Sequence, residues 1–190
     1  AVCLWNLFNP FIELMWGKDM LFDDFTVLCI VLNFLTAGLQ NAVISYKDAC
    51  GLFWQGRYRP AASAALNIIV SLLLVKPLGV AGVFLGTIIS RFLTTWWFDA
   101  RLVHRHAFGI SPKKYYLRYV LSLVRVCLVG GAISFATLPM QKYGAFALFA
   151  VRLALCLIIP NVCFLLRFRK TEEFKYLLEK IKPILKKIKR

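Results

Sequence analysis

The chain has 190 residues, of which 60% are hydrophobic and only 17% are charged. A soluble domain is roughly 45–50% apolar, and an apolar run of about 18 residues or more is typical of a helix that crosses a bilayer. Several such runs occur, so composition excludes an ordinary soluble domain and predicts an all-α, polytopic transmembrane helix bundle. The net charge of +15 would suit nucleic acid. However, the basic residues gather in alternate loops and at the C-terminus, a pattern that favours membrane topology and no nucleic-acid partner.

The chain begins inside an apolar stretch, AVCLWNLF, without the charged n-region of a signal peptide. We therefore expect residues 1–14 to be the end of a helix and the chain to be a fragment of a longer protein. The six cysteines form no CxxC pattern and fall mostly in apolar runs. They predict no disulfide framework, no metal site and no cofactor.

The first full span is expected at 25–45, and it carries a polar stripe. Asn33, Thr36 and Gln40 follow one another at i, i+3 and i+7, which places them on one helix face. A polar stripe in a span either hydrogen-bonds to a neighbouring helix or lines a water-filled cavity. The sequence leaves both interpretations open.

The next two spans, 60–76 and 79–98, predict a transmembrane hairpin joined by a Lys-Pro-Leu-Gly turn. Asn67 lies in the first arm, where an unpaired amide in hydrocarbon would be costly. Arg91 lies near the end of the second arm, and either snorkels to the interface or faces a cavity and meets an anion. Small residues, which let another backbone approach closely, recur along the second arm at Gly82, Gly86 and Ser90.

Two more spans, 117–138 and 145–166, complete about five full spans plus the end of another. The loops 46–60 and 99–118 are basic, and these loops are expected in the cytoplasm. The alternation predicts a multi-pass protein of the cytoplasmic membrane with a cytoplasmic C-terminus.

We divide the chain into a transmembrane region, 1–168, and a basic tail, 169–190. Apolar residues recur near helical spacing in the tail, which predicts an amphipathic helix on the lipids of the inner leaflet. A solvated, partly disordered tail is the alternative.

Motifs of catalysis are missing from the sequence. There is no phosphate-cradling glycine loop, no H-E-x-x-H and no nucleophile elbow. The acids lie in loops, near span ends or in the tail, so we expect a protein that is not an enzyme. The spans hold amides, hydroxyls and arginines, which suit an uncharged polyol with an anionic head, such as a lipid-linked sugar pyrophosphate.

The stretch GLFWQGRYRPAASAALNIIVSLLLVKPLGVAGVFLGTIISRF carries a recognisable pattern. It combines a basic approach that ends at Pro60, then Asn67, the K-P-L-G-V-A-G turn, Gly86-Thr87 and a helix that ends in Trp96-Trp97. It resembles the C-terminal half of polysaccharide (O-antigen type) flippases, of the multidrug/oligosaccharidyl-lipid/polysaccharide exporter superfamily. The resemblance covers roughly residues 1–168 and is most specific at 51–97.

The resemblance implies a fold of fourteen transmembrane helices, with two pseudosymmetric six-helix lobes and two extra helices. This chain would carry the end of helix nine through helix fourteen, and the missing N-terminal lobe would be its partner. The family flips undecaprenyl-diphosphate-linked oligosaccharide units across the membrane by alternating access. On its own, the fragment would therefore not be expected to transport anything.

Two groups of residues become candidate sites under this interpretation. The cytoplasmic entrance would hold Arg57 and Arg59, which either attract the anionic lipid head or only fix topology. The substrate cavity would be lined by Asn33, Gln40, Asn67 and Arg91.

Two other functions stay open. A multidrug exporter of the same superfamily would more typically show an acidic residue within a span. A membrane-embedded glycosyltransferase or polymerase of the polysaccharide pathway would need large external loops, whereas the external links here are short.

Overall fold

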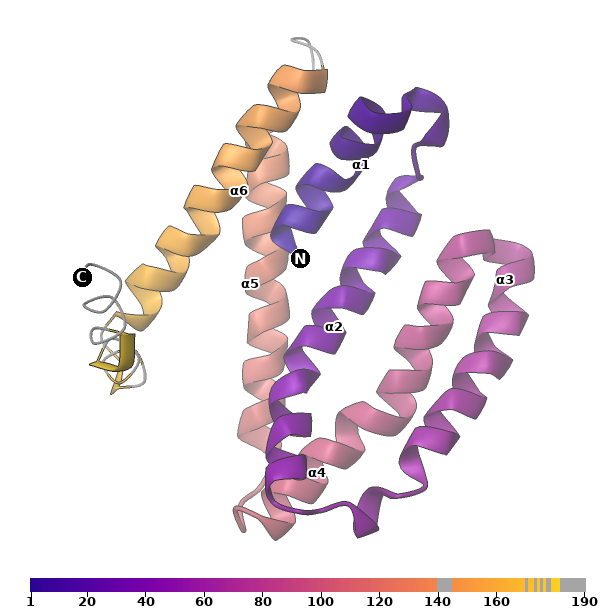
Figure 1. Ribbon diagram of the computed structural model, residues 1–190, viewed down its shortest axis with the longest axis vertical. Coiled ribbons are helices and arrows are strands. Elements are labelled where there is room, and N and C mark those ends of the chain that lie inside the picture. The colour runs from indigo at the N-terminus through magenta and orange to yellow at the C-terminus, as the bar shows by residue number, and fades with distance from the viewer. Residues whose placement is uncertain (140–144, 170, 173, 175, 177–178, 182–190) are drawn as a thin grey trace, which may run out of the picture.

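The computed structural model describes residues 1–139 and 145–169, and, in the tail, 171, 172, 174, 176 and 179–181. This part of the chain is helical and contains no strand, which confirms the all-α class. The helices, drawn in Figure 1, are α1 (Val2–Trp16), α2 (Asp24–Ala49), α3 (Arg59–Arg91), α4 (Trp97–His106), α5 (Lys113–Thr137) and α6 (Ala145–Phe168). The shorter elements are η1 (Lys18–Met20), η2 (Trp54–Gly56) and the π-helical turn η3 (Phe92–Trp96).

Four helical stretches of the described chain are long and apolar enough to cross a membrane: Asp24–Ala49, Trp54–His106, Lys113–Thr137 and Phe146–Arg167. Their outer surfaces are covered by large apolar side chains, such as Leu73 at 69% and Phe135 at 76% exposure. Such a surface is stable in lipid, where a helix satisfies its own backbone hydrogen bonds. These are the features of a helical membrane protein.

Local signals in the sequence explain where these helices begin and turn. Asp23 caps α2, because its carboxylate accepts hydrogen bonds from the Thr26 hydroxyl at 2.6 Å and from its backbone N–H at 3.0 Å. These bonds hold the pKa of Asp23 below its usual range. Pro60 occupies the first turn of α3, where its missing N–H leaves no helical bond unmade.

The predicted hairpin is present within α3. Gly79 has φ 55° and ψ −132°, a conformation that glycine adopts readily, and it divides α3 into two arms. Figure 1 shows the arms side by side, and the first is about 30 Å long at 1.5 Å per residue. The sequence predicted five spans and the structure has four stretches, because the spans 60–76 and 79–98 belong to one stretch that folds back at Gly79.

Small residues let the two arms of α3 approach closely. A Cβ atom added to Gly86 would lie 2.8 Å from Cα of Ser71, and one added to Gly82 would lie 2.8 Å from the backbone nitrogen of Val75. Real Cβ atoms do not approach backbone atoms so closely. The predicted small-residue stripe therefore faces the first arm.

The helices pack in two groups. The first contains α1, which packs against α5 and α6 around the buried side chains of Val2, Ile133 and Cys156. The second contains α2, which packs against α3 and α4 with Val43 and Val103 in its core. Helix α2 lies between the α3 hairpin and the first group (Figure 1).

The prediction of a loop at 99–118 was wrong in its first part, because the chain stays helical through η3 and α4 as far as His106. Helix α4 is amphipathic. Ala100 and Val103 are buried, whereas Arg101 and Arg105 are exposed. The charged face of this segment led to the prediction of a loop. Burial of its apolar face stabilises a helix instead.

Connections that the sequence predicts on opposite sides of the membrane lie at opposite ends of the bundle. The connections from α2 to α3 and from α4 to α5 share one end, and the Gly79 turn and the link from α1 to α2 lie at the other (Figure 1). This arrangement agrees with the alternation of charge, while the orientation in the membrane stays a prediction. Most of the predicted amphipathic tail, including 177–178 and 182–190, lies outside the described residues.

The close packing of the two arms of α3 can be tested by substitution of Gly86. Replacing Gly86 with Ala should force the arms apart and destabilise the protein by about 1–3 kcal/mol, the usual cost of overpacking. Gly131→Ala is the control, since a Cβ atom at Gly131 meets nothing within 4 Å. Thermal unfolding in detergent measures both, and equal melting temperatures for the two variants would contradict the interlocked hairpin.

Candidate functional site

A polar cleft of about 380 Å³ lies between α2 and the two arms of α3. Two guanidinium groups, those of Arg59 and Arg91, line it, and no carboxylate does so among the described residues. The cleft therefore combines positive charge with neutral hydrogen-bonding groups. The other polar lining residues are Gln40, Ser63, Asn67, Thr87, Ser90 and Thr95.

Arg91 joins the second arm of α3 to α2. Its Nη1 donates to the backbone oxygen of Asn33 at 3.1 Å and to the side-chain Oδ1 of Asn33 at 3.0 Å. A third, longer contact reaches Oγ1 of Thr36 at 3.4 Å. The guanidinium thus points towards α2 and the cleft, and part of the polar stripe of α2 serves as its hydrogen-bond acceptor.

Asn67 joins the two arms of the hairpin. Its Oδ1 accepts hydrogen bonds from Ser71 at 3.0 Å and from Thr87 at 3.3 Å. The side chain also lines the cleft, as does Gln40 of α2, which is only 5% exposed. Three of the four predicted cavity residues thus meet at the cleft, whereas Asn33 is not among its lining residues and contacts Arg91 instead.

The structure separates the two arginines of the predicted entrance. Arg59 lines the cleft and forms an ion pair with Asp99, to whose Oδ2 its Nη1 donates. Arg57 is exposed, and its guanidinium lies 3.8 Å from the ring centre of Trp54 and 4.6 Å from that of Tyr58. Only one of the pair therefore contributes to the cleft.

Asp99 is a residue whose place the sequence did not reveal. It was expected in a solvated loop, but it is 2% exposed in the first turn of α4 and pairs with Arg59. A signal was present, because Leu102 and Val103 follow at i+3 and i+4 and share a helix face with it. The surrounding basic residues concealed this apolar face.

A second buried polar network joins α1, α5 and α6. Nη1 of Arg152 donates to the backbone oxygen of Asn6 at 3.2 Å, and its Nε donates to Oγ1 of Thr137 at 3.0 Å. Asn6 is 1% exposed, donates to the backbone oxygen of Gly130 at 3.3 Å and accepts from Ser134 at 2.9 Å. These groups satisfy one another, so the network joins helices rather than forming an open site.

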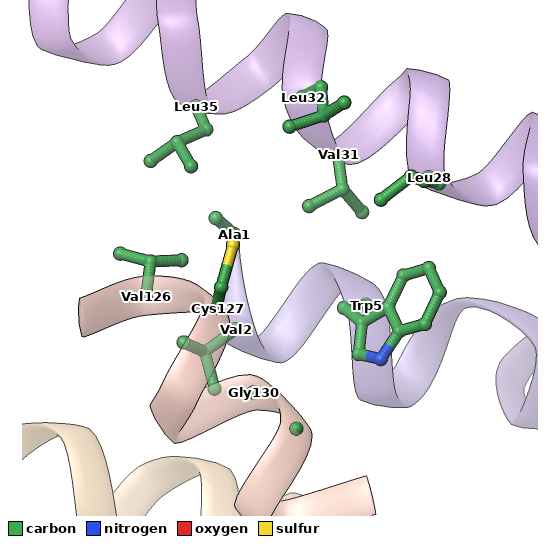
Figure 2. Close-up of a pocket in the computed structure, with 11 residues that line it drawn as sticks. Ala1, Val2, Trp5, Leu28, Val31, Leu32, Leu35, Val126, Cys127 and Gly130 are labelled. Atoms are coloured by element: carbon green, nitrogen blue, oxygen red, sulfur yellow. The ribbon is translucent and has the colours of Figure 1, made fainter. Parts of the chain in front are cut away.

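Figure 2 shows an apolar cavity of about 220 Å³ between α1, α2 and α5. Trp5, Val31, Val126 and Cys127 are among its lining residues. The walls of this cavity are mostly apolar and present few hydrogen-bonding groups to a ligand. The polar cleft is therefore the better candidate for recognition of a polar ligand.

No group of three or more His, Cys, Asp or Glu residues in the described ranges is placed to hold a metal ion. No protein-family model matches the chain, and no curated protein or solved structure is significantly similar to it. The chemistry of the polar cleft is therefore the main structural guide to function.

The contact between Arg91 and Asn33 can be tested by a double-mutant cycle. Asn33→Leu removes the amide acceptor of a guanidinium that lies within a membrane-spanning helix, and we expect a loss of about 1–3 kcal/mol. Because Arg91→Leu removes the same contact, the double variant should lose less than the sum of the two single variants. Unfolding in detergent measures the effects.

Asn161→Leu is the matched control for this cycle. Asn161 is exposed, and among the described residues its side chain donates to the backbone of its own helix, at Leu157. It should change stability little. Additive effects of Asn33→Leu and Arg91→Leu would show that the two residues do not interact.

Proposed function

We propose that the chain is the C-terminal part of a bacterial flippase. It would move undecaprenyl-diphosphate-linked oligosaccharide units across the cytoplasmic membrane by alternating access, for cell-surface polysaccharide biosynthesis. The observation that carries this proposal is the polar cleft, which holds arginines, amides and hydroxyls but no carboxylate among its described lining residues. On this proposal the protein is a transporter and not an enzyme.

The cleft suits both polar parts of such a substrate. Guanidinium groups form paired, charge-assisted hydrogen bonds with phosphate oxygens, as Arg59 and Arg91 could with a diphosphate. Neutral amides and hydroxyls, such as those of Gln40, Asn67 and Thr87, exchange hydrogen bonds with sugar hydroxyls. The polyprenyl chain stays in the bilayer beside the apolar outer surface of the bundle.

This assignment places the described helices within a larger exporter. Helix α1 would be the end of helix nine. Helices ten to fourteen would be α2, the first arm of α3, the second arm of α3 with its continuation into α4, α5 and α6. The N-terminal lobe would close the cleft from the opposite side. The C-terminus would be cytoplasmic, next to the lipids of the inner leaflet.

Within this function, the predicted residues take different roles. Gln40, Asn67 and Arg91 face the substrate, and Asn33 positions the guanidinium of Arg91. Arg59 lies at the start of α3, at the cytoplasmic end of the cleft in the proposed topology. Arg57 contributes to the positive surface at the entrance and to topology.

A multidrug exporter of the same superfamily is the second candidate, and Asp99 is the observation that favours it. A buried carboxylate within a helical stretch is a typical ligand for a coupling cation or a cationic drug. However, this carboxylate is already paired with Arg59. An anionic ligand for the cleft is therefore the stronger proposal.

The decisive experiment is leaflet exchange by the full-length gene product in liposomes. We expect it to accelerate exchange of an undecaprenyl-diphosphate oligosaccharide over protein-free vesicles. Loss of a hydrogen bond to a charged group commonly costs a factor of about ten or more, so Arg91→Leu should slow exchange by about that much. Asn67→Leu removes a neutral hydrogen bond, worth about 1 kcal/mol, and should slow exchange by about fivefold. Asn161→Leu, outside the cleft, should leave the rate unchanged.

Two outcomes would contradict the flippase. Exchange at the background rate, together with export of a cationic dye under an ion gradient, would favour the multidrug exporter. Exchange that is equally fast in the Asn67→Leu, Arg91→Leu and Asn161→Leu proteins would show that the cleft does not carry the substrate.

A further inference from the structure

Arg59 lies between two sites for a negative charge. Its side chain lines the polar cleft, and its Nη1 donates to Oδ2 of Asp99, which is not among the residues that line the cleft. The side chain of Arg59 is 15% exposed and that of Asp99 only 3%. A guanidinium carries five N–H donors. Arg59 can therefore bind an anion in the cleft or the carboxylate behind it.

The ion pair is incompletely satisfied. Asp99 is the only buried carboxylate among the residues that the structure describes. Its Oδ1 is buried and accepts no hydrogen bond from them, and Nε of Arg59 is likewise buried without an acceptor. Unpaired buried polar atoms cost free energy. A doubly charged anion that binds more of the guanidinium's donors can therefore compete with Asp99.

The other charged groups around Asp99 make such an exchange feasible. Lys47 and Asp48 of α2 and Tyr115 of α5 are close enough to act on it electrostatically. Lys47 is buried, and its Nζ lies 3.6 Å from Oδ1 of Asp48. The Lys47 ammonium acts on the Asp99 carboxylate as a second positive charge besides Arg59. Lys47 therefore lowers the cost of leaving the Asp99 carboxylate without Arg59, although Asp48 shares the same ammonium.

We propose that Asp99 competes, from within the protein, for the guanidinium of Arg59. While the cleft is empty, Asp99 binds Arg59. When an anionic headgroup enters the cleft, Arg59 leaves Asp99 and binds the headgroup. The class of that anion, a lipid-linked diphosphate, rests on the proposed function. The exchange itself rests on the ion pair. Because Arg59 starts α3 and Asp99 lies in the first turn of α4, binding of the anion breaks a contact between these helices. The cleft is thereby coupled to helix movement at that end of the bundle.

The test measures binding of inorganic pyrophosphate to the full-length protein in nanodiscs of zwitterionic phosphatidylcholine, by calorimetry. Asp99→Asn removes the competitor and should tighten binding by about tenfold, the scale of one hydrogen bond to a charged group. Arg59→Gln should weaken binding by at least about as much. The double variant should resemble Arg59→Gln, because without Arg59 there is nothing for Asp99 to compete for.

Arg101→Gln is the matched control. Arg101 is an exposed arginine on the same helix as Asp99, two residues further along the chain. Its replacement removes one positive charge without touching the ion pair or the cleft. Arg101→Gln should therefore leave the affinity for pyrophosphate close to that of the wild type.

A second measurement uses the wild-type protein alone and does not depend on the folding of any variant. Infrared difference spectra with 13C-labelled aspartate report the environment of the carboxylates. Saturation with pyrophosphate should shift the band of one aspartate, because Asp99 loses its guanidinium partner. Carboxylate bands that do not change at saturation would overturn the exchange.

Four further outcomes are informative. Unchanged affinity in Asp99→Asn, or an equal loss in Arg59→Gln and Arg101→Gln, would overturn the proposal. Tighter binding in Asp99→Asn without leaflet exchange of the lipid-linked oligosaccharide would support the competitor while rejecting the flippase. Leaflet exchange of the lipid-linked oligosaccharide, with no effect of Asp99→Asn on pyrophosphate binding, would support the flippase and reject the competitor.

Discussion

Arg91 can lie in a membrane-spanning helix because α2 supplies acceptors for its guanidinium. Lipid offers no hydrogen bonds, so an ionised side chain at this depth must find its partners within the protein. Asn33 supplies two of them, and the contact fixes α2 against the second arm of the hairpin. Two walls of the cleft, α2 and the second arm of α3, are thereby held together. Asn67, bonded to Ser71 and Thr87, fixes the two arms in the same way.

The contacts of the three helical arginines Arg59, Arg91 and Arg152 differ in what they leave free. Arg152 donates through Nε to α5 and through Nη1 to α1, whose polar groups also bind one another. Arg91 is held by neutral acceptors, so its charge is not cancelled and remains available to the cleft. Arg59 is held by a carboxylate, so its charge is neutralised until that partner is displaced. These differences assign a structural role to Arg152 and ligand-related roles to Arg91 and Arg59.

Features encoded by local chemistry were predictable from the sequence. The hairpin turn needs a glycine at positive φ after a proline, and both Pro77 and Gly79 are visible in the chain. The polar stripes follow from helical spacing alone, which is why Gln40, Asn67 and Arg91 could be selected before their meeting at the cleft was known.

Features that depend on packing between distant segments were not predictable. Arg57 and Arg59 look alike in sequence, yet the start of α3 directs one into the cleft and the loop leaves the other over aromatic rings. Asp99 sits among basic residues, which indicate a loop by charge. Its burial depends on packing against α2, which is far away in the chain, and against the start of α5, the next helix.

The π-helical turn η3 explains how one continuous helix presents both Arg91 and Asp99 to the same region. The two residues are eight positions apart, which in a regular α-helix would turn their side chains roughly 80° away from each other. A π turn accommodates about one additional residue, so the separation acts as about seven positions, or two turns. Arg91 then lines the cleft, and Asp99 lines a smaller adjoining space. Gln40 and Thr95 line both. The π turn therefore brings the Asp99 carboxylate close to the cleft, where it can compete with a bound anion for Arg59.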